Sequence, residues 1–146
     1  MVFWQLTIDA NDPARLARFW AQALGYQAAP PAQPETTWHQ HYRARLGGDA
    51  AFADRIFDPA GLRPPLWFQQ VPESKAGKNR LHVDLYPTGR DSALPVERRV
   101  ELVEAKVAEL TGLGASVYRR FRDDDPADPF YYVAMRDPEG NEFCVG

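Results

Sequence analysis

The sequence predicts an α+β fold in which two halves of one chain repeat the same plan. Three observations support this prediction. In each half, a stretch of alternating apolar and polar residues precedes a stretch with apolar residues at helical spacing. Each half then carries an Asp-Pro-x-Gly turn that leads to a final strand, and a connector containing proline and glycine separates the halves.

The first half opens with a predicted strand and a predicted helix. Residues 4–9 alternate, so their apolar members, Trp4 among them, are expected to pack under the helix. Asp12 and Pro13 suit a helix start, because aspartate accepts from free backbone N–H groups and proline fits the first helical position. Gly25 suits the left-handed residue that ends a helix. The apolar stripe between them consists of Leu16, Phe19, Trp20, Ala23 and Leu24.

The second half repeats these signals. Residues 80–85 alternate, with Leu81, Val83 and Leu85 expected to face the helix. The later helix ends near Gly112 and Gly114 and carries one apolar face, made of Val100, Val103, Val107 and Leu110. Short strands are expected after both helices, at 26–28 and 115–118. The two turns are Phe57–Gly61 and Arg136–Gly140, and they lead to final strands at Leu66–Gln70 and Glu142–Val145.

These signals predict one domain of 146 residues with two modules, because neither half alone buries enough apolar surface to be stable. Module one spans about 1–71, the connector about 72–79, and module two about 80–146. Residues 29–55 give the least regular pattern, with one brief strand candidate at Trp38–Leu46.

Composition excludes several classes of protein. The net charge is −3, and 17 basic residues are scattered among 20 acidic ones, so we expect no nucleic-acid partner. No apolar run is long enough to cross a membrane, and the N-terminus has no leader-like pattern, which favours a cytoplasmic protein. The single cysteine, Cys144, fits a reducing compartment. No organic cofactor is expected.

Strand alternation directs a set of polar residues away from the helices. Gln5, His82 and Glu142 are expected on the open face of the sheet, where they offer an amide, an imidazole and a carboxylate. Such a set suits a divalent cation such as nickel, manganese, iron or zinc, with positions left open for substrate. Glu142 is also the candidate catalytic residue, which would move a proton if it left the metal.

Each of these residues also has a structural interpretation. His82 fits a hydrogen-bonded histidine, and Glu142 fits an ion pair with Arg80. Gln5 fits an amide satisfied by neighbouring backbone. His39 and His41 stand two residues apart in the irregular segment, where contact with substrate is favoured over metal binding.

Other residues are predicted to contact substrate. Trp67 and Tyr132 are expected to form pocket walls, because aromatic rings stack on flat ligands. Thr7 shares the open face with Gln5, Gln69 shares it with Trp67, and Cys144 shares it with Glu142.

Three stretches, 12–20, 78–82 and 137–145, carry a family likeness: Asp-Pro-Ala-Arg-Leu-Ala-Arg-Phe-Trp, Lys-Asn-Arg-Leu-His and Asp-Pro-Glu-Gly-Asn-Glu-Phe-Cys-Val. They resemble the glyoxalase-like branch of the vicinal oxygen chelate superfamily, which includes glyoxalase I, dioxygenases, and fosfomycin- and bleomycin-resistance proteins. The resemblance implies two βαβββ modules forming a cup-shaped, partly closed mixed β-sheet with helices outside, often as a homodimer. It also implies a metal bound by the first and last strands of each module.

Carried onto this chain, the resemblance assigns metal ligation to Gln5, His82 and Glu142. The fourth position falls near Trp67, which is not a ligand, so the site would be a three-ligand one like that of the fosfomycin-resistance enzymes. The expected function is therefore a metal-dependent lyase, isomerase or dioxygenase acting on a small molecule. Two alternatives are a metal-free binding or sequestering protein of the bleomycin-resistance type and a purely structural partner-binding module.

Overall fold

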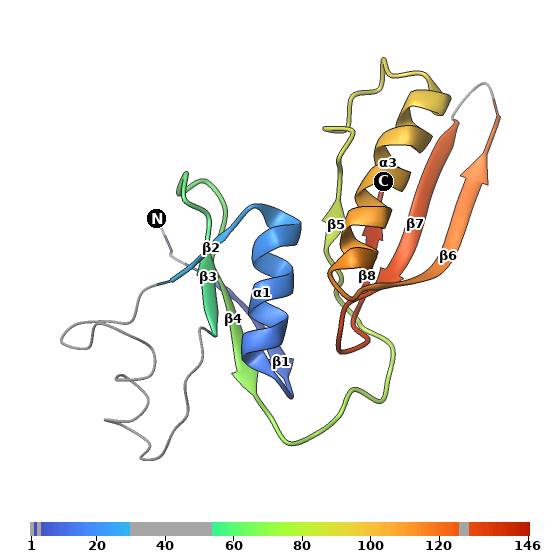
Figure 1. Cartoon of the computed structure of the whole chain (residues 1–146). Coiled ribbons are helices and arrows are strands. Elements are labelled where there is room, and N and C mark those ends of the chain that lie inside the picture. The colour runs from blue at the N-terminus through green and yellow to red at the C-terminus, as the bar shows by residue number, and fades with distance from the viewer. Residues whose placement is uncertain (1, 3, 30–53, 126–128) are drawn as a thin grey trace, which may run out of the picture. The chain divides into compact units, whose positions relative to one another are not determined.

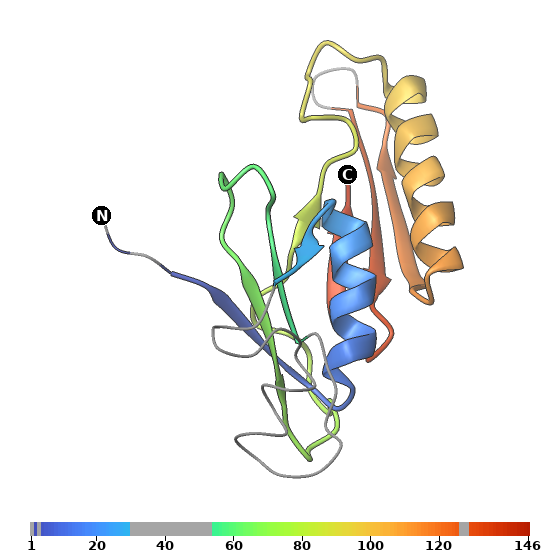
Figure 2. The ribbon, with the colours of Figure 1, turned by 60° about the vertical axis from the view of Figure 1, so that its left-hand side comes forward.

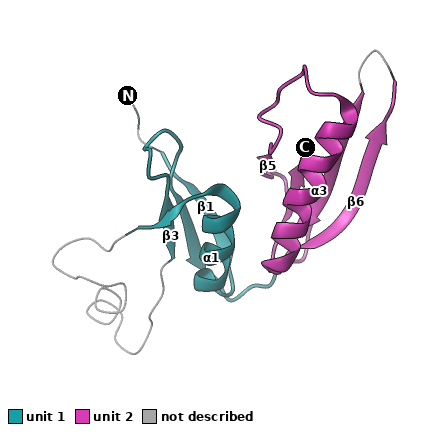
Figure 3. Cartoon of the chain, turned by 45° about the horizontal axis from the view of Figure 1, so that its top comes forward, with its two compact units in different colours: residues 1–74 teal, residues 75–146 magenta. Residues whose placement is uncertain are grey.

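The computed structural model describes residues 2, 4–29, 54–125 and 129–146 (Figure 1). The chain divides into two compact units, residues 1–74 and 75–146 (Figure 3). Their boundary falls inside the predicted connector, and the division into modules of a single domain stays a prediction. The predicted strand at 38–46, with His39 and His41, lies outside the described residues.

The first unit has the order strand, helix, then three strands. Its elements are β1 (Leu6–Ala10), α1 (Pro13–Leu24), β2 (Gln27–Ala28), β3 (Arg55–Phe57) and β4 (Leu66–Gln70). The sheet order is β1-β4-β3-β2. β1 pairs in parallel with β4, while the other two pairings are antiparallel. α1 lies against this sheet (Figure 2).

The second unit repeats this topology. Its elements are β5 (Asp84–Leu85), α3 (Val96–Gly112), β6 (Ser116–Asp123), β7 (Phe130–Arg136) and β8 (Glu142–Val145). The sheet order is β5-β8-β7-β6, with β5 parallel to β8 and the other pairings antiparallel. The α+β class and the two βαβββ modules are therefore confirmed.

The first helix begins and ends at the predicted residues. The Asp12 carboxylate accepts from the backbone N–H of Arg15 at 3.0 Å. Gly25 has a φ of 69°, and its N–H donates back to the last turn. The predicted stripe forms the core under α1, and of its residues Leu24 alone is partly exposed. The buried residues of α1 are Pro13, Leu16, Ala17, Phe19, Trp20 and Ala23.

The second helix also uses the predicted face. Val103, Val107 and Leu110 are buried, whereas Val100 is partly exposed. They pack with the helix-facing side chains of β7 and β8, all fully buried: Val133, Met135, Phe143 and Val145. Among the described residues, no helix is long and apolar enough to cross a membrane.

The two Asp-Pro-x-Gly turns are built alike. Asp58 and Asp137 are each 4% exposed, and each carboxylate accepts from the N–H two residues later, at 3.1 and 3.0 Å. The glycine of each turn has a positive φ, 68° at Gly61 and 87° at Gly140, a conformation that favours glycine. These buried carboxylates hold together the turns that precede β4 and β8.

The structure corrects the sequence prediction at two strand starts. The strand expected over 80–85 is limited to Asp84–Leu85, and Leu81 is 79% exposed rather than packed under the helix. Trp4 is 61% exposed. In both cases pairing with the final strand begins later in the chain, at Leu6 in β1 and at Asp84 in β5, so the alternation has no sheet to follow before it.

Candidate functional site

The second unit presents a polar sheet face opposite α3. In β8, Phe143 and Val145 are buried toward the helix, so Glu142 and Cys144 lie on the opposite, partly exposed face. Asp84 of β5 is in register with Cys144. His82 lies just before β5, and its Nδ1 is 2.8 Å from Asp84 Oδ1, so the two side chains lie together.

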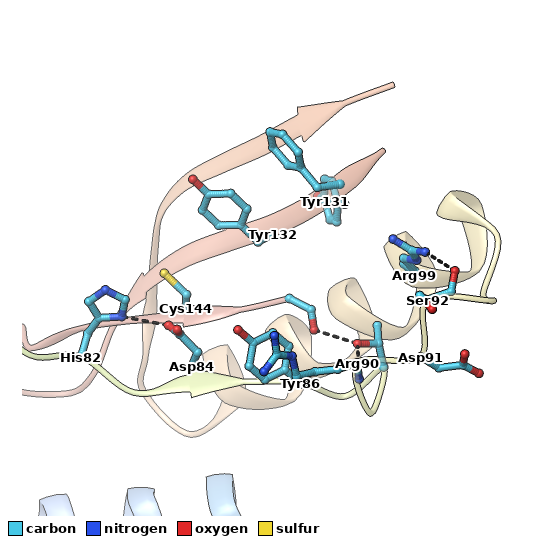
Figure 4. A pocket seen from close by; sticks show the side chains of 13 residues that line it. His82, Asp84, Tyr86, Arg90, Asp91, Ser92, Arg99, Tyr131, Tyr132 and Cys144 are labelled. Carbon is cyan, nitrogen blue, oxygen red and sulfur yellow. Dashed lines mark hydrogen bonds and ion pairs between the residues drawn. The ribbon is translucent and has the colours of Figure 1, made fainter. Parts of the chain in front are cut away.

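A pocket of about 530 Å³ lies on this face (Figure 4). Its lining includes four aromatic residues, Tyr86, Phe130, Tyr131 and Tyr132. Tyr132 stacks on Phe121 of β6, with ring centroids 4.5 Å apart and an angle of 14° between the ring planes. This volume and lining are typical of small-molecule sites.

Three side chains of types that can bind a metal gather at one end of the pocket. The ligand atoms of His82, Asp84 and Cys144 all lie within 4.8 Å of one another. They form the one such group found among the described residues. His82 Nδ1 lies 2.8 Å from Asp84 Oδ1, a hydrogen bond that orients the imidazole ring. Burial raises the pKa of the Cys144 thiol, and the Asp84 carboxylate adds to the rise.

Glu142 lies on the same sheet face but has different neighbours. Its carboxylate is 2.9 Å from Lys75 Nζ and accepts from the Asn79 N–H at 3.1 Å. The Lys75 ammonium, together with this N–H, lowers the pKa of Glu142 to about 2. A second pocket of about 570 Å³ contains Glu142 together with Lys75, Lys78 and Arg136. Glu142 is therefore paired with a lysine of the connector rather than with Arg80.

The predicted residues of the second unit thus fall into two places. His82, Cys144 and Tyr132 line the pocket of about 530 Å³. Glu142 lines the other pocket. The assignment of Glu142 as a metal ligand and as the catalytic residue stays a prediction.

In the first unit, the predicted substrate residues share one sheet face. Thr7 is in register with Trp67, and Gln69 lies two residues further along β4. The Trp67 indole N–H donates to Asp54 at 3.0 Å, and the Arg55 guanidinium lies 5.0 Å from the Trp67 ring centroid. Gln5 is exposed and precedes β1.

The repeated pairing shows which residues occupy equivalent positions. Thr7 pairs with Trp67 as Asp84 pairs with Cys144, so Gln5 is the counterpart of His82. Extending the β3–β4 register by one residue makes Pro65 the counterpart of Glu142.

By this register the fourth position of the family pattern falls at Pro65, two residues from Trp67, and neither side chain is a metal ligand. Pro65 follows Asp58 by seven residues, whereas Glu142 follows Asp137 by five, so the first unit has two more residues between the turn and this position.

The sequence did not predict a role for three residues that line the two pockets: Asp84, Lys75 and Arg90. Alternation places Asp84 on a strand without indicating a role, although its spacing of two from His82 was the available signal. Lys75 sits in the connector and Arg90 in the loop after β5, where no periodic pattern directs a side chain.

Comparison with known proteins identifies the class. Two βαβββ units, each with a parallel first and last strand, define a protein built from duplicated modules. The chain belongs to the glyoxalase-like domain family, whose model matches residues 5–146. None of the curated protein sequences matches this chain.

Solved structures share the fold at low sequence identity. A glyoxalase/bleomycin resistance protein/dioxygenase family enzyme from Burkholderia phytofirmans PsJN has a TM-score of 0.58 and 14% identity, with 97% of this chain and 94% of that one covered. A possible glyoxalase from Bacillus cereus has a TM-score of 0.55 and 17% identity, covering 99% and 97%. A mutant of the fosfomycin resistance protein FosX from Listeria monocytogenes, complexed with Mn(II) and 1S,2S-dihydroxypropylphosphonic acid, has a TM-score of 0.56 and 11% identity, covering 99% and 90%.

Proposed function

We propose that this chain is a metal-dependent glyoxalase-like enzyme that binds a small oxygenated molecule in the pocket of its second unit. His82, Asp84 and Cys144 would hold the metal. The observation that carries this proposal is the convergence of their three ligand atoms within 4.8 Å at one end of an aromatic-lined pocket. The Mn(II) bound to the FosX relative supports a metal in this fold.

The donor set fits a divalent transition metal. Ligand bonds of about 2.0 to 2.3 Å in a tetrahedral site place ligand atoms roughly 3.5 Å apart, so a small contraction of this group is sufficient. Imidazole, carboxylate and thiolate together favour zinc, cobalt or nickel over magnesium or calcium. Three protein ligands leave positions open for substrate.

The surrounding residues suit a small substrate. A bound divalent ion would supply Lewis acidity toward a substrate oxygen. Tyr86 and Tyr132 offer ring faces that hold a flat ligand and exclude water from it. His82 Nδ1 and Asp84 Oδ1 are already 2.8 Å apart, so a bound metal would replace the hydrogen bond between these two ligand atoms. Lyase, isomerase and dioxygenase activity are the reaction classes to assay.

Metal binding by matched variants tests this proposal. We expect purified protein to bind zinc stoichiometrically, and we expect His82→Ala and Asp84→Asn to weaken binding at least tenfold, measured by calorimetry. Glu142→Gln is the control, because Glu142 is already neutralised by Lys75. The outcome would favour Gln5, His82 and Glu142 as the ligands if Glu142→Gln abolished binding while Asp84→Asn did not.

The second candidate function is a metal-free binding protein. The observation favouring it is that Glu142, the predicted acidic ligand, has Lys75 as its cation. This alternative predicts that no divalent metal co-purifies and that none raises the melting temperature of wild type above that of His82→Ala. Metal content by elemental analysis and a thermal-shift series with nickel, manganese, iron and zinc separate the two functions.

A further inference from the structure

One cation of the pocket, Arg90, has no carboxylate partner among the residues that the structure describes. Arg90 lines the pocket, and its guanidinium lies 5.0 Å from the centroid of the Tyr86 ring (Figure 4). In the described part of the chain, no carboxylate is within ion-pair distance of it. Arg99, which also lines the pocket, differs, because its guanidinium donates to three backbone carbonyls at 2.8 to 3.1 Å. The hydrogen bonds of Arg99 therefore hold the loop backbone, whereas the Arg90 guanidinium is available to a ligand.

The backbone at Arg90 is unusual for an arginine. Thr88 to Asp91 form a tight turn in which the Asp91 N–H donates to the Thr88 carbonyl at 3.2 Å. Gly89 and Arg90 have φ values of 64° and 59°, as in a type I′ turn. Glycine, asparagine or aspartate normally occupies the second of these positions. The turn thus places an arginine side chain beside the pocket despite an unfavourable backbone conformation.

We propose that the pocket recognises a flat, ring-bearing carboxylate. Its ring would lie against Tyr86 and Tyr132, and its carboxylate would pair with the Arg90 guanidinium. This proposal rests on the proposed function, because it names the substrate class of the same site. A guanidinium matches a carboxylate with two parallel hydrogen bonds.

The charges around the pocket favour a single negative charge on the ligand. Asp84 and Asp91 line the same pocket as Arg90. A doubly charged phosphate would be repelled by these carboxylates more strongly than a carboxylate would. The volume of about 530 Å³ accommodates one or two fused rings.

Three probes separate the contributions of charge and ring. We expect 2-naphthoate to bind the wild type about tenfold more tightly than the uncharged 2-naphthamide, because one charge-assisted contact is lost. Cyclohexanecarboxylate keeps the charge but has no aromatic face, and we expect weaker binding by several-fold. Calorimetry at one fixed ionic strength measures all three.

Arginine variants assign the contact. Arg90→Gln should reduce the preference for naphthoate over naphthamide to near parity. Arg90→Gly serves as a second variant that suits the left-handed backbone, so a loss of preference there cannot arise from a failed turn. Arg119→Gln is the matched control, because Arg119 also lies over a ring, that of Phe121 at 4.7 Å, but does not line the pocket. The Arg119→Gln variant should prefer naphthoate over naphthamide by the same factor as the wild type.

The outcomes distinguish this proposal from the metal proposal. The titrations are made on metal-free and on zinc-loaded protein. An unchanged preference in both arginine variants, or equal binding of naphthoate and naphthamide to wild type, would overturn the carboxylate assignment whatever the metal result. The protein could also fail to bind zinc and still prefer naphthoate in a way that depends on Arg90. That result would support the carboxylate assignment and would contradict the metal-dependent function.

Discussion

His82, Asp84 and Cys144 meet through one hydrogen bond and one strand pairing. His82 lies just before β5 and is hydrogen-bonded to Asp84 at 2.8 Å, and the parallel pairing of β5 with β8 brings Cys144 beside Asp84. Glu142 shares the sheet face of Cys144, two residues before it, but the connector supplies Lys75 as its partner. The side of the sheet on which a polar residue lies therefore does not by itself determine its partner.

The ion pair of Glu142 predicts a pH-dependent stability. Its folded pKa of about 2 lies below the usual value of about 4.3, so the ionised carboxylate stabilises the fold above that usual value. This contribution is lost as pH falls toward about 2. We expect Glu142→Gln to cost about 1 kcal/mol at neutral pH, the upper range for a partly exposed pair, and less at about pH 3.

Thermal unfolding across this pH range measures the difference. Glu101→Gln is the control, since Glu101 pairs with Arg98 on the exposed surface of α3, where the loss should be smaller. A destabilisation by Glu142→Gln that stayed constant from neutral to acidic pH would contradict the assigned ion pair.

At the residue scale, alternation accounts for the facing of Cys144 in β8, whereas His82 precedes β5 and lies beside Asp84 through a hydrogen bond. Alternation was not sufficient to predict the roles of Lys75 and Arg90, because both lie in irregular segments whose side-chain directions depend on tertiary contacts. The same alternation failed at Leu81, where no neighbouring strand enforces it.

At the scale of elements, the local signals predicted the helices and turns closely. Asp12 and Gly25 delimit α1 through contacts within a few residues, which sequence spacing can reveal. The final strands, Leu66–Gln70 and Glu142–Val145, have the predicted bounds because buried aspartate turns precede them. Strand β5 is shorter than predicted because its length depends on pairing with β8.

At this scale, the largest loss of stability is expected from a substitution in the second aspartate turn. Asp137 is buried and accepts from the N–H groups of Glu139 and Asn141, as well as from the Asn141 side chain. We expect Asp137→Ala to lower the free energy of unfolding by about 2 kcal/mol, because several donors lose a charged acceptor. Denaturant unfolding measures the change.

The helix cap provides the comparison. Asp12→Ala removes one exposed capping bond and should cost about 1 kcal/mol. If Asp137→Ala cost no more than Asp12→Ala, the turn would not be the rigid entry to β8 inferred from its hydrogen bonds.

At the scale of the whole molecule, the two units have the same topology but different chemistry at equivalent positions. Gln5, Thr7 and Trp67 in the first unit correspond to His82, Asp84 and Cys144 in the second. An amide, a hydroxyl and an indole make a poor metal site, so the duplicated fold carries this donor set in one unit only among the described residues. Homodimer formation stays a prediction.

The absorption spectrum of the cobalt-substituted protein tests the central claim most directly. Ligation by Cys144 predicts a thiolate-to-cobalt charge-transfer band in the near ultraviolet, which Cys144→Ser should remove while Glu142→Gln retains it. Stoichiometric cobalt binding without that band, or a band unaffected by Cys144→Ser, would contradict a metal held by His82, Asp84 and Cys144.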